Sequence, residues 1–163
     1  MPSTLSRYED VMNGTPTPKN ASQRQIGGNK RLPRVSKTSV AKVKRELWEV
    51  CRKIVFFLYG NDCYTCDATN LQGSNRQCGH LPWPKSILPS LMKYDIRLLR
   101  TQCGRCNIWL SGNQVEGYKR MVEEIGQIEM DKLDAERRKV IPASIIDWLN
   151  RLEEYKKLLE KCV

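Results

Sequence analysis

The sequence contains no uninterrupted apolar stretch close to the ~20 residues that a helix needs to cross a bilayer. Its first residues, MPSTLSRYED, lack the basic start and apolar run of a signal peptide. Aromatic residues make up only 7% of the chain and hydrophobic residues 40%, so we expect a modest core that needs support from a metal or a partner. These shortages predict a soluble, cytoplasmic protein with no membrane partner.

Acidic residues are scarce in the first part of the chain. The net charge is +10, and residues 1–62 hold twelve basic against five acidic residues. Residues 63–126 hold eight against five, and residues 127–163 hold eight of each. Because a basic surface attracts polyanions, we expect nucleic acid to contact the first half of the molecule. An anionic membrane and a merely solvated basic tail are the alternatives.

The sequence divides into three parts. Residues 1–36 show no apolar periodicity and predict a flexible basic arm. Residues 37–126 form the expected principal domain, led by a basic helix that Ser39 caps and Gly60 ends. The buried stripe of that helix recurs at steps of three and four: Val40, Val43, Leu47, Cys51, Ile54 and Leu58. Residues 127–163 predict C-terminal helices, so the fold class is α+β and mostly helical.

No helical period is present in residues 61–102. The run LPWPKSILPS has three prolines, which exclude a continuous helix, so short strands or loops are expected. After them, Asn113 can cap a helix that ends at Gly126. The last helix, from about Ala143, has an apolar stripe too wide for a lone surface helix. Packing on the domain is the preferred interpretation, and a homodimer seam is the alternative.

Four of the seven cysteines form two closely spaced pairs. Cys63 and Cys66 are separated by two residues, as are Cys103 and Cys106, and 36 residues lie between the pairs. Two such turns facing each other make the closed tetrahedron of a structural zinc site. A redox function would need a βαβ pattern beside one pair, which is missing.

The other three cysteines do not fit this pattern. Cys51 and Cys162 lie in expected helices as core or terminal thiols. Cys78 and His80 leave an alternative open, in which they complete a Cys3His zinc site with the first cysteine pair.

His80 is the only histidine, and a lone histidine is usually structural. Its neighbours favour another function, because it lies in an irregular segment between the two cysteine pairs. Asn107 follows the last cysteine of the second pair directly. Zinc would therefore link a loop bearing an imidazole to a helix bearing a carboxamide. Nuclease chemistry uses a neutral imidazole to deprotonate water and an oxygen ligand to hold a divalent cation against the phosphate.

The runs CYTC, QCGH, LLRTQCGRCN and LSGN resemble the zinc-containing HNH (ββα-metal) endonucleases. More narrowly they are similar to the phage NinG/Rap recombination nucleases, and more remotely to the phage resolvase endonuclease seven. The resemblance covers roughly residues 40–135 and leaves out the N-terminal arm. It implies a ββα-metal core and the cutting of branched DNA, such as D-loops and Holliday junctions, during phage recombination. Phage recombination proteins and the host cell cytoplasm are then the implied partners and location.

The same resemblance implies roles for individual residues. His80 becomes the general base and Asn107 the residue beside a catalytic Mg²⁺ or Mn²⁺, while Asn113 matches a further position of the family. The structural Zn²⁺ would be bound by Cys63, Cys66, Cys103 and Cys106. Many HNH enzymes carry a cation ligand immediately before the general base, whereas this chain has Gly79, as the narrower family does. Asp62, Asp67 and Asp95 are candidates for the second ligand by their closeness in sequence alone.

Branched or duplex DNA is the expected partner. Phosphate contacts would give steep salt dependence with little base specificity. The candidate DNA-binding residues are Lys42, Lys44, Arg45, Arg52, Lys53, Lys85, Lys93, Arg97 and Arg100. Trp83, which lies close to His80, is expected either to stack on an unpaired base or to pack in the core.

Overall fold

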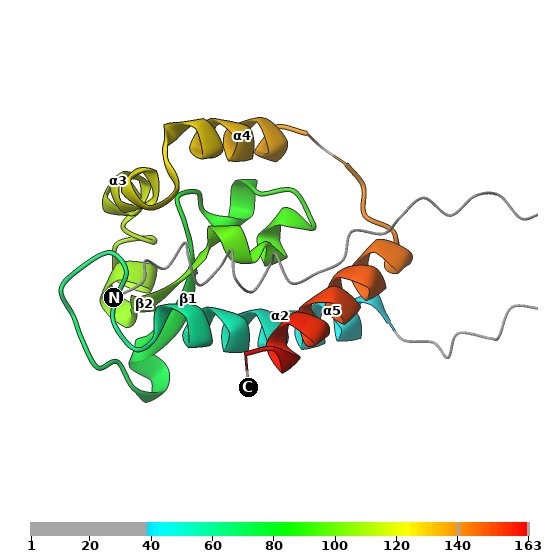
Figure 1. Ribbon diagram of the computed structural model, residues 1–163, viewed down its shortest axis with the longest axis horizontal. Helices are drawn as coiled ribbons and strands as arrows, with labels where there is room; N and C mark the ends of the chain where they lie inside the picture. The colour runs from blue at the N-terminus through cyan, green and yellow to red at the C-terminus, as the bar shows by residue number, and fades with distance from the viewer. Residues whose placement is uncertain (1–38, 140, 163) are drawn as a thin grey trace, which may run out of the picture.

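The computed structural model describes residues 39–139 and 141–162, so the predicted arm lies outside the described residues. The elements are α2 (Val40–Tyr59), β1 (Arg76–His80), β2 (Leu99–Cys103), α3 (Gln114–Ile125), α4 (Gln127–Arg137) and α5 (Ile145–Glu160). Figure 1 shows α2 and α5 side by side below the strands, with α3 and α4 above them. The fold is therefore α+β and mostly helical, as predicted. Among the helices of the described part, none has the length and apolar character that a membrane crossing requires.

The two strands are antiparallel, with Arg76 opposite Cys103 and His80 opposite Leu99. Residues 81–98 connect them through three short 3-10 turns, in agreement with the effect expected of the prolines. These turns are η2 (Lys85–Ile87), η3 (Met92–Tyr94) and η4 (Ile96–Leu98), and a fourth, η1 (Gly73–Asn75), precedes β1. A one-turn π-helix, η5 (Arg105–Trp109), follows β2 directly and contacts both strands.

The first hydrophobic cluster joins α2, α5 and the strands. Ser39 caps α2 with its side chain, and Gly60 ends the helix with a φ of 65°. The buried face of α2 includes Leu47 and Ile54, and it packs against Trp148 of α5. Packing of the last helix on the domain is therefore confirmed. The helix begins at Ile145, slightly later than predicted, because Ser144 and Asp147 form a reciprocal capping box.

A second hydrophobic cluster lies between the 81–98 segment and helices α3 and α4. Leu81, Met121 and Leu133 are fully buried there. Gly117 allows α3 to approach closely, because a Cβ at this position would lie 2.5 Å from Leu81 Cδ2. The contact fixes α3, and with it the loop before α3, against the strand pair.

The third cluster has little apolar content. It consists of Cys63, Cys103, Cys106 and Leu71, with Cys66 and Ala68 packed beside them. Burial of so little aliphatic surface stabilises this corner weakly, since stabilisation scales with apolar area. We therefore expect a bound metal to supply much of its stability.

Candidate metal centre and active site

The four paired cysteines converge at one end of the strand pair. Their sulfur atoms all lie within 4.8 Å of one another. The Sγ atoms of Cys66 and Cys103 are 3.8 Å apart, and a zinc tetrathiolate with Zn–S bonds of about 2.3 Å has edges of roughly this length. The cluster can therefore hold a metal ion such as zinc, as the spacing predicted.

The alternative Cys3His set is wrong. Cys78 is buried in the first hydrophobic cluster with α2, and the sulfur atoms that lie together are those of the four paired cysteines. The His80 ring is bound to a backbone carbonyl instead of approaching the paired cysteines. Cys51 is likewise buried in the first cluster, and Cys162 is also buried, in agreement with their predicted structural role.

Backbone N–H groups stabilise thiolates in the cysteine cluster. Cys63 Sγ accepts from the Cys103 N–H at 3.3 Å, and Cys103 Sγ accepts from the Cys106 N–H at 3.4 Å. Burial alone would raise the pKa of Cys63, but the Cys103 N–H and the contacts from Thr65 outweigh it and lower this pKa to about 7. For Cys66, burial and the neighbouring thiols raise the pKa to about 12. Ionisation of Cys66 near pH 7 therefore requires a cation in the cluster.

Asn113 supports the cysteine cluster instead of capping α3 through its side chain. Its backbone is left-handed, with a φ of 47°, and its side chain makes no capping hydrogen bond, so the predicted side-chain cap is wrong. The amide Nδ2 donates to Thr65 O at 3.0 Å and approaches Cys106 Sγ at 3.9 Å. Asn113 thus links the two cysteine turns to each other.

His80 ends β1 with its ring held on two sides. Nε2 lies 2.8 Å from Lys93 O, and the ring stacks on Trp48 at 5.5 Å with an interplanar angle of 2°. Because a carbonyl only accepts, Nε2 carries the proton, and Nδ1 of the neutral ring is a free base. Burial lowers the pKa of His80; the bond to Lys93 O opposes this, and the charges of Lys85 and Lys93 add to it. The imidazole is therefore neutral near pH 7.

Asn107 lies in η5 and approaches β1 at Gly79. Its Nδ2 donates to Gln77 Oε1 at 2.7 Å, which leaves Oδ1 free for another partner. Oδ1 lies 2.9 Å from the point where a Cβ would stand at Gly79. The carboxamide oxygen is thus one residue along the strand from His80. Within the described residues no hydrogen bond joins Asn107 to His80, and their side-chain partners are Gln77 and Lys93 respectively.

Gln102 is a site residue that the sequence analysis missed. Its Nε2 donates to Gly112 O at 2.7 Å and to Thr65 Oγ1 at 2.8 Å, which fixes the orientation of the amide. Its Oε1 is buried without a hydrogen-bond partner and lies 1.8 Å from the Cβ point of Gly79. Residue 79 therefore has no room for a side chain. The only sequence signal that could have identified Gln102 as a site residue was its position next to the paired cysteine Cys103, in a segment expected to form a short strand or a loop.

The aspartates suggested as second cation ligands are engaged elsewhere. The Asp95 carboxylate binds Arg97, and Asp62 accepts the N–H of Asn70. Asp67 is exposed, with Arg120 at 3.9 Å. None of these contacts directs a carboxylate to Asn107.

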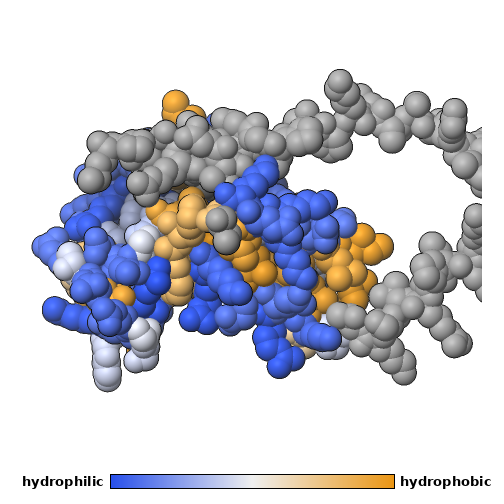
Figure 2. Space-filling model, turned by 60° about the horizontal axis from the view of Figure 1, so that its bottom comes forward, coloured by the Kyte–Doolittle hydropathy of each residue, from blue (hydrophilic) through white to orange (hydrophobic). Residues whose placement is uncertain are grey.

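The candidate phosphate-binding residues differ in how available they are. Lys42, Arg45, Lys53 and Lys85 are exposed. Lys44 Nζ lies 4.5 Å from the Trp148 ring, and Arg52 pairs with Glu49 at 3.2 Å, so both are partly engaged. Figure 2 shows largely hydrophilic side chains on the face that includes α2, with hydrophobic ones between them. Lys85 Nζ likewise lies 5.0 Å from the Trp48 ring. The exposed cations of α2, Lys42, Arg45 and Lys53, therefore form the available part of the predicted interface.

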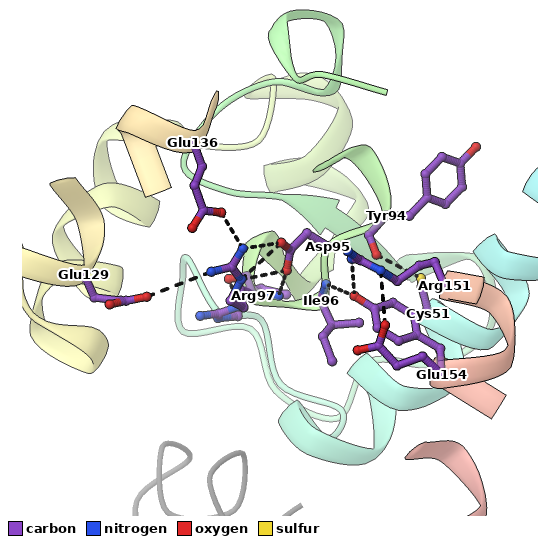
Figure 3. A network of polar contacts seen from close by, with 11 residues as sticks. Cys51, Tyr94, Asp95, Ile96, Arg97, Glu129, Glu136, Arg151 and Glu154 are labelled. Atoms are coloured by element: carbon purple, nitrogen blue, oxygen red, sulfur yellow. Dashed lines mark hydrogen bonds and ion pairs between the residues drawn. The ribbon is translucent and has the colours of Figure 1, made fainter. Parts of the chain in front are cut away.

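Arg97 and Arg100 do not belong to that interface. Arg100 is 1% exposed and pairs with Glu124 at 3.2 Å, so no phosphate can reach it. Arg97 is held between Asp95 and Glu136, at 2.7 Å from each, and Figure 3 shows this network joining the 94–97 segment to α4. Both guanidinium groups are structural, and sequence alone could not show their carboxylate partners.

Trp83 is the other aromatic candidate near His80. Its ring packs on the second hydrophobic cluster, and the Arg137 guanidinium lies 4.9 Å from the ring centroid. These contacts favour its core interpretation over stacking on a base.

In comparisons with known proteins, no family model, curated protein or solved structure matches the chain. The resemblance to the HNH endonucleases thus stays a prediction from the residues quoted above.

Proposed function

We propose that the protein is a metal-dependent DNA endonuclease of the zinc-containing HNH type, acting on branched DNA. The observation that carries the proposal is the state of His80: Nε2 bound to Lys93 O and Nδ1 unprotonated, one residue from the position that Asn107 Oδ1 approaches. Two antiparallel strands followed by a helical turn and a cysteine cluster are also what a ββα-metal core would have.

The chain's own residues account for the proton transfer. A water beside His80 gives its proton to Nδ1 while its oxygen bonds to phosphorus, and one phosphodiester P–O bond breaks, so that the ester oxygen leaves as an alcohol after taking a proton from solvent. Lys93 O holds the Nε2 proton and stabilises the imidazolium that forms, and Trp48 keeps the ring in one plane. His80 thus acts as the general base.

The residues around Gly79 suit a hard divalent cation. Asn107 Oδ1 and Gln102 Oε1 both lie within 3 Å of the Cβ point of Gly79, and Gln102 Oε1 has no donor. Mg²⁺ and Mn²⁺ prefer oxygen ligands, and Mg²⁺ commonly completes its shell with water and phosphate oxygens. Asn107 is the residue that would hold the cation. When bound, the cation would polarise the phosphoryl oxygen as a Lewis acid.

The experiment compares a labelled four-way junction with a linear duplex of the same sequence, with and without Mg²⁺ or Mn²⁺. We expect the wild type to cut the junction only with a divalent cation. His80→Ala should lower the rate about 10²–10⁴-fold, the typical contribution of a general base. Asn107→Ala should raise the Mg²⁺ concentration needed, whereas Asn150→Ala, the same change on an exposed part of α5, should alter nothing.

The opposite outcome defines a second class of protein. If wild type and His80→Ala both bind the junction and neither cuts it with any divalent cation, the protein is a non-catalytic zinc-stapled DNA-binding or adaptor module. The feature that favours this alternative is Gly79, because many HNH enzymes carry a cation ligand at that position, whereas here only two neutral carboxamides lie beside it.

A further inference from the structure

An exposed apolar turn follows Asn107 directly. The exposed fractions of Ile108, Trp109 and Leu110 are 60%, 82% and 46%. An indole this exposed is unusual, since tryptophan is highly buried on average. Trp148 is 2% exposed, and Trp48 and Trp83 pack against His80 and the second hydrophobic cluster. Trp109 is thus the one exposed tryptophan of the described chain, since Trp48 and Trp83 are partly buried.

The backbone around Trp109 is held in place. Leu110 N–H donates to Arg105 O at 3.0 Å, and Gly112 N–H donates to Cys106 O at 2.8 Å. The turn is therefore attached to the cysteine cluster at Cys106. Because these bonds fix the backbone, the indole projects from a defined position, and only its side-chain torsions lose freedom on binding.

The surroundings of the turn suit a nucleotide. Arg105 is exposed and lies four residues before Trp109 in η5, so both side chains project from one side of this helical turn. Gly112, at the end of the turn, lies beside the His80 backbone: a Cβ built on Gly112 would be 3.5 Å from His80 O. An aromatic face beside a guanidinium matches a base beside its phosphate. The turn also borders the residues proposed to act on DNA.

We propose that Trp109 stacks on an unpaired nucleobase of branched or locally opened DNA while Arg105 contacts a neighbouring phosphate. The proposal rests on the proposed function for its substrate class and deepens it. A paired base in a duplex has both faces covered by its neighbours, so this contact would select opened DNA over duplex. Stacking on one base corresponds to a roughly 5- to 150-fold difference in affinity.

The test measures binding without a divalent cation, so that no cutting is needed. The full-length, zinc-loaded protein is titrated with a duplex holding an internal run of unpaired thymines and with the fully paired duplex. Trp109→Ala should weaken binding to the opened DNA roughly 5- to 150-fold and change duplex binding little. Trp109→Phe should retain most of the preference. Ile146→Ala, another exposed apolar residue on α5, is the matched control. Tryptophan emission should be quenched by opened DNA in the wild type and much less in Trp109→Phe.

Other results overturn the proposal. Equal losses on both DNAs, no loss on either, or an effect of Trp109→Ala on self-association alone would assign the turn to another role. Zinc content and melting temperature identify a folding defect, in which case Trp109→Phe and the emission readout decide. The two proposals fail separately: selective binding without cutting sinks the nuclease alone, and cutting with an unchanged preference in Trp109→Ala sinks the stacking site alone.

Discussion

At the scale of single residues, the tautomer of His80 is the most informative feature. The sequence identified the residue but not its state, which depends on Lys93 O and on the ring of Trp48, 13 and 32 positions away. Only folding brings these groups together. Asn113 teaches the same lesson, because its sequence context suited a helix cap and the fold uses its amide on Thr65 instead.

The lowered pKa of His80 predicts how cutting depends on pH. The base must be neutral, so the rate should fall as the pH drops, with a midpoint below the ordinary histidine value of about 6.5. The log of kcat/KM against pH, at saturating Mg²⁺, measures this midpoint.

The same lowered pKa predicts how stability depends on pH. At His80 the folded protein binds fewer protons than the unfolded chain, so this residue contributes stability above about pH 6.5 that is lost as the pH falls. His80→Ala should therefore lose less in Tm between pH 7.5 and 5.5, and an identical loss would contradict the buried neutral ring.

The substitution Asn113→Gly distinguishes the contribution of the side-chain amide from that of the left-handed backbone conformation at this position. Glycine keeps the positive φ without cost but removes the hydrogen bond to Thr65 O and the approach to Cys106 Sγ. We expect the free energy of unfolding to fall by about 1–3 kcal/mol and zinc to pass faster to a chelator. Thermal melts and a colorimetric chelator assay measure both. Unchanged zinc release would show that the amide does not support the cluster.

At the scale of elements, the two cysteine turns are joined by side chains and backbone from β2, η5 and the loop before α3. The pair spacing was enough to predict this cluster, because two-residue spacing is a local property of a tight turn. The strand register and the π-helical turn were not predictable, since both depend on contacts between distant segments. Gln102 shows the difference, as its partners Thr65 and Gly112 come from both sides of the cluster.

Cys103→Ser should remove the bound metal and destabilise the end of the strand pair. The third hydrophobic cluster has only Leu71 and Ala68 apart from the cysteines, and structural zinc contributes about 10–16 kcal/mol in small zinc-binding peptides. Elemental analysis and melting curves, with and without a chelator, measure the effect. Cys162→Ser, a buried cysteine outside the cluster, should keep its zinc. Normal zinc content in Cys103→Ser would refute the tetrathiolate assignment.

At the scale of the whole molecule, the charge distribution predicted a basic surface, and the structure refines which cations are available. Lys42, Arg45 and Lys53 are exposed, whereas Arg97 and Arg100 serve ion pairs. Composition could not separate these two groups, because a cation's availability depends on the carboxylates that folding brings to it.

Removal of residues 1–35 should weaken DNA binding and flatten its salt dependence. This segment contains six basic and two acidic residues. For duplex DNA, the slope of log affinity against log salt becomes shallower by about 0.9 for every phosphate that the truncated protein no longer neutralises. Titrations at salt concentrations of roughly 50 to 200 mM measure this slope, because protein–DNA affinity falls steeply over that range. A slope equal to that of the full chain would show that the arm does not touch DNA.

The packing of α5 on α2 has a consequence for synthesis. Residues 40–59 leave the ribosome well before residues 145–160, which cover their apolar side and are made about a hundred residues later. Contacts so distant in sequence form slowly, and the nascent chain exposes Leu47 and Ile54 until translation of the last helix is complete. A truncated messenger RNA would thus yield an aggregation-prone polypeptide with an exposed apolar helix face, and we expect cellular chaperones to bind it.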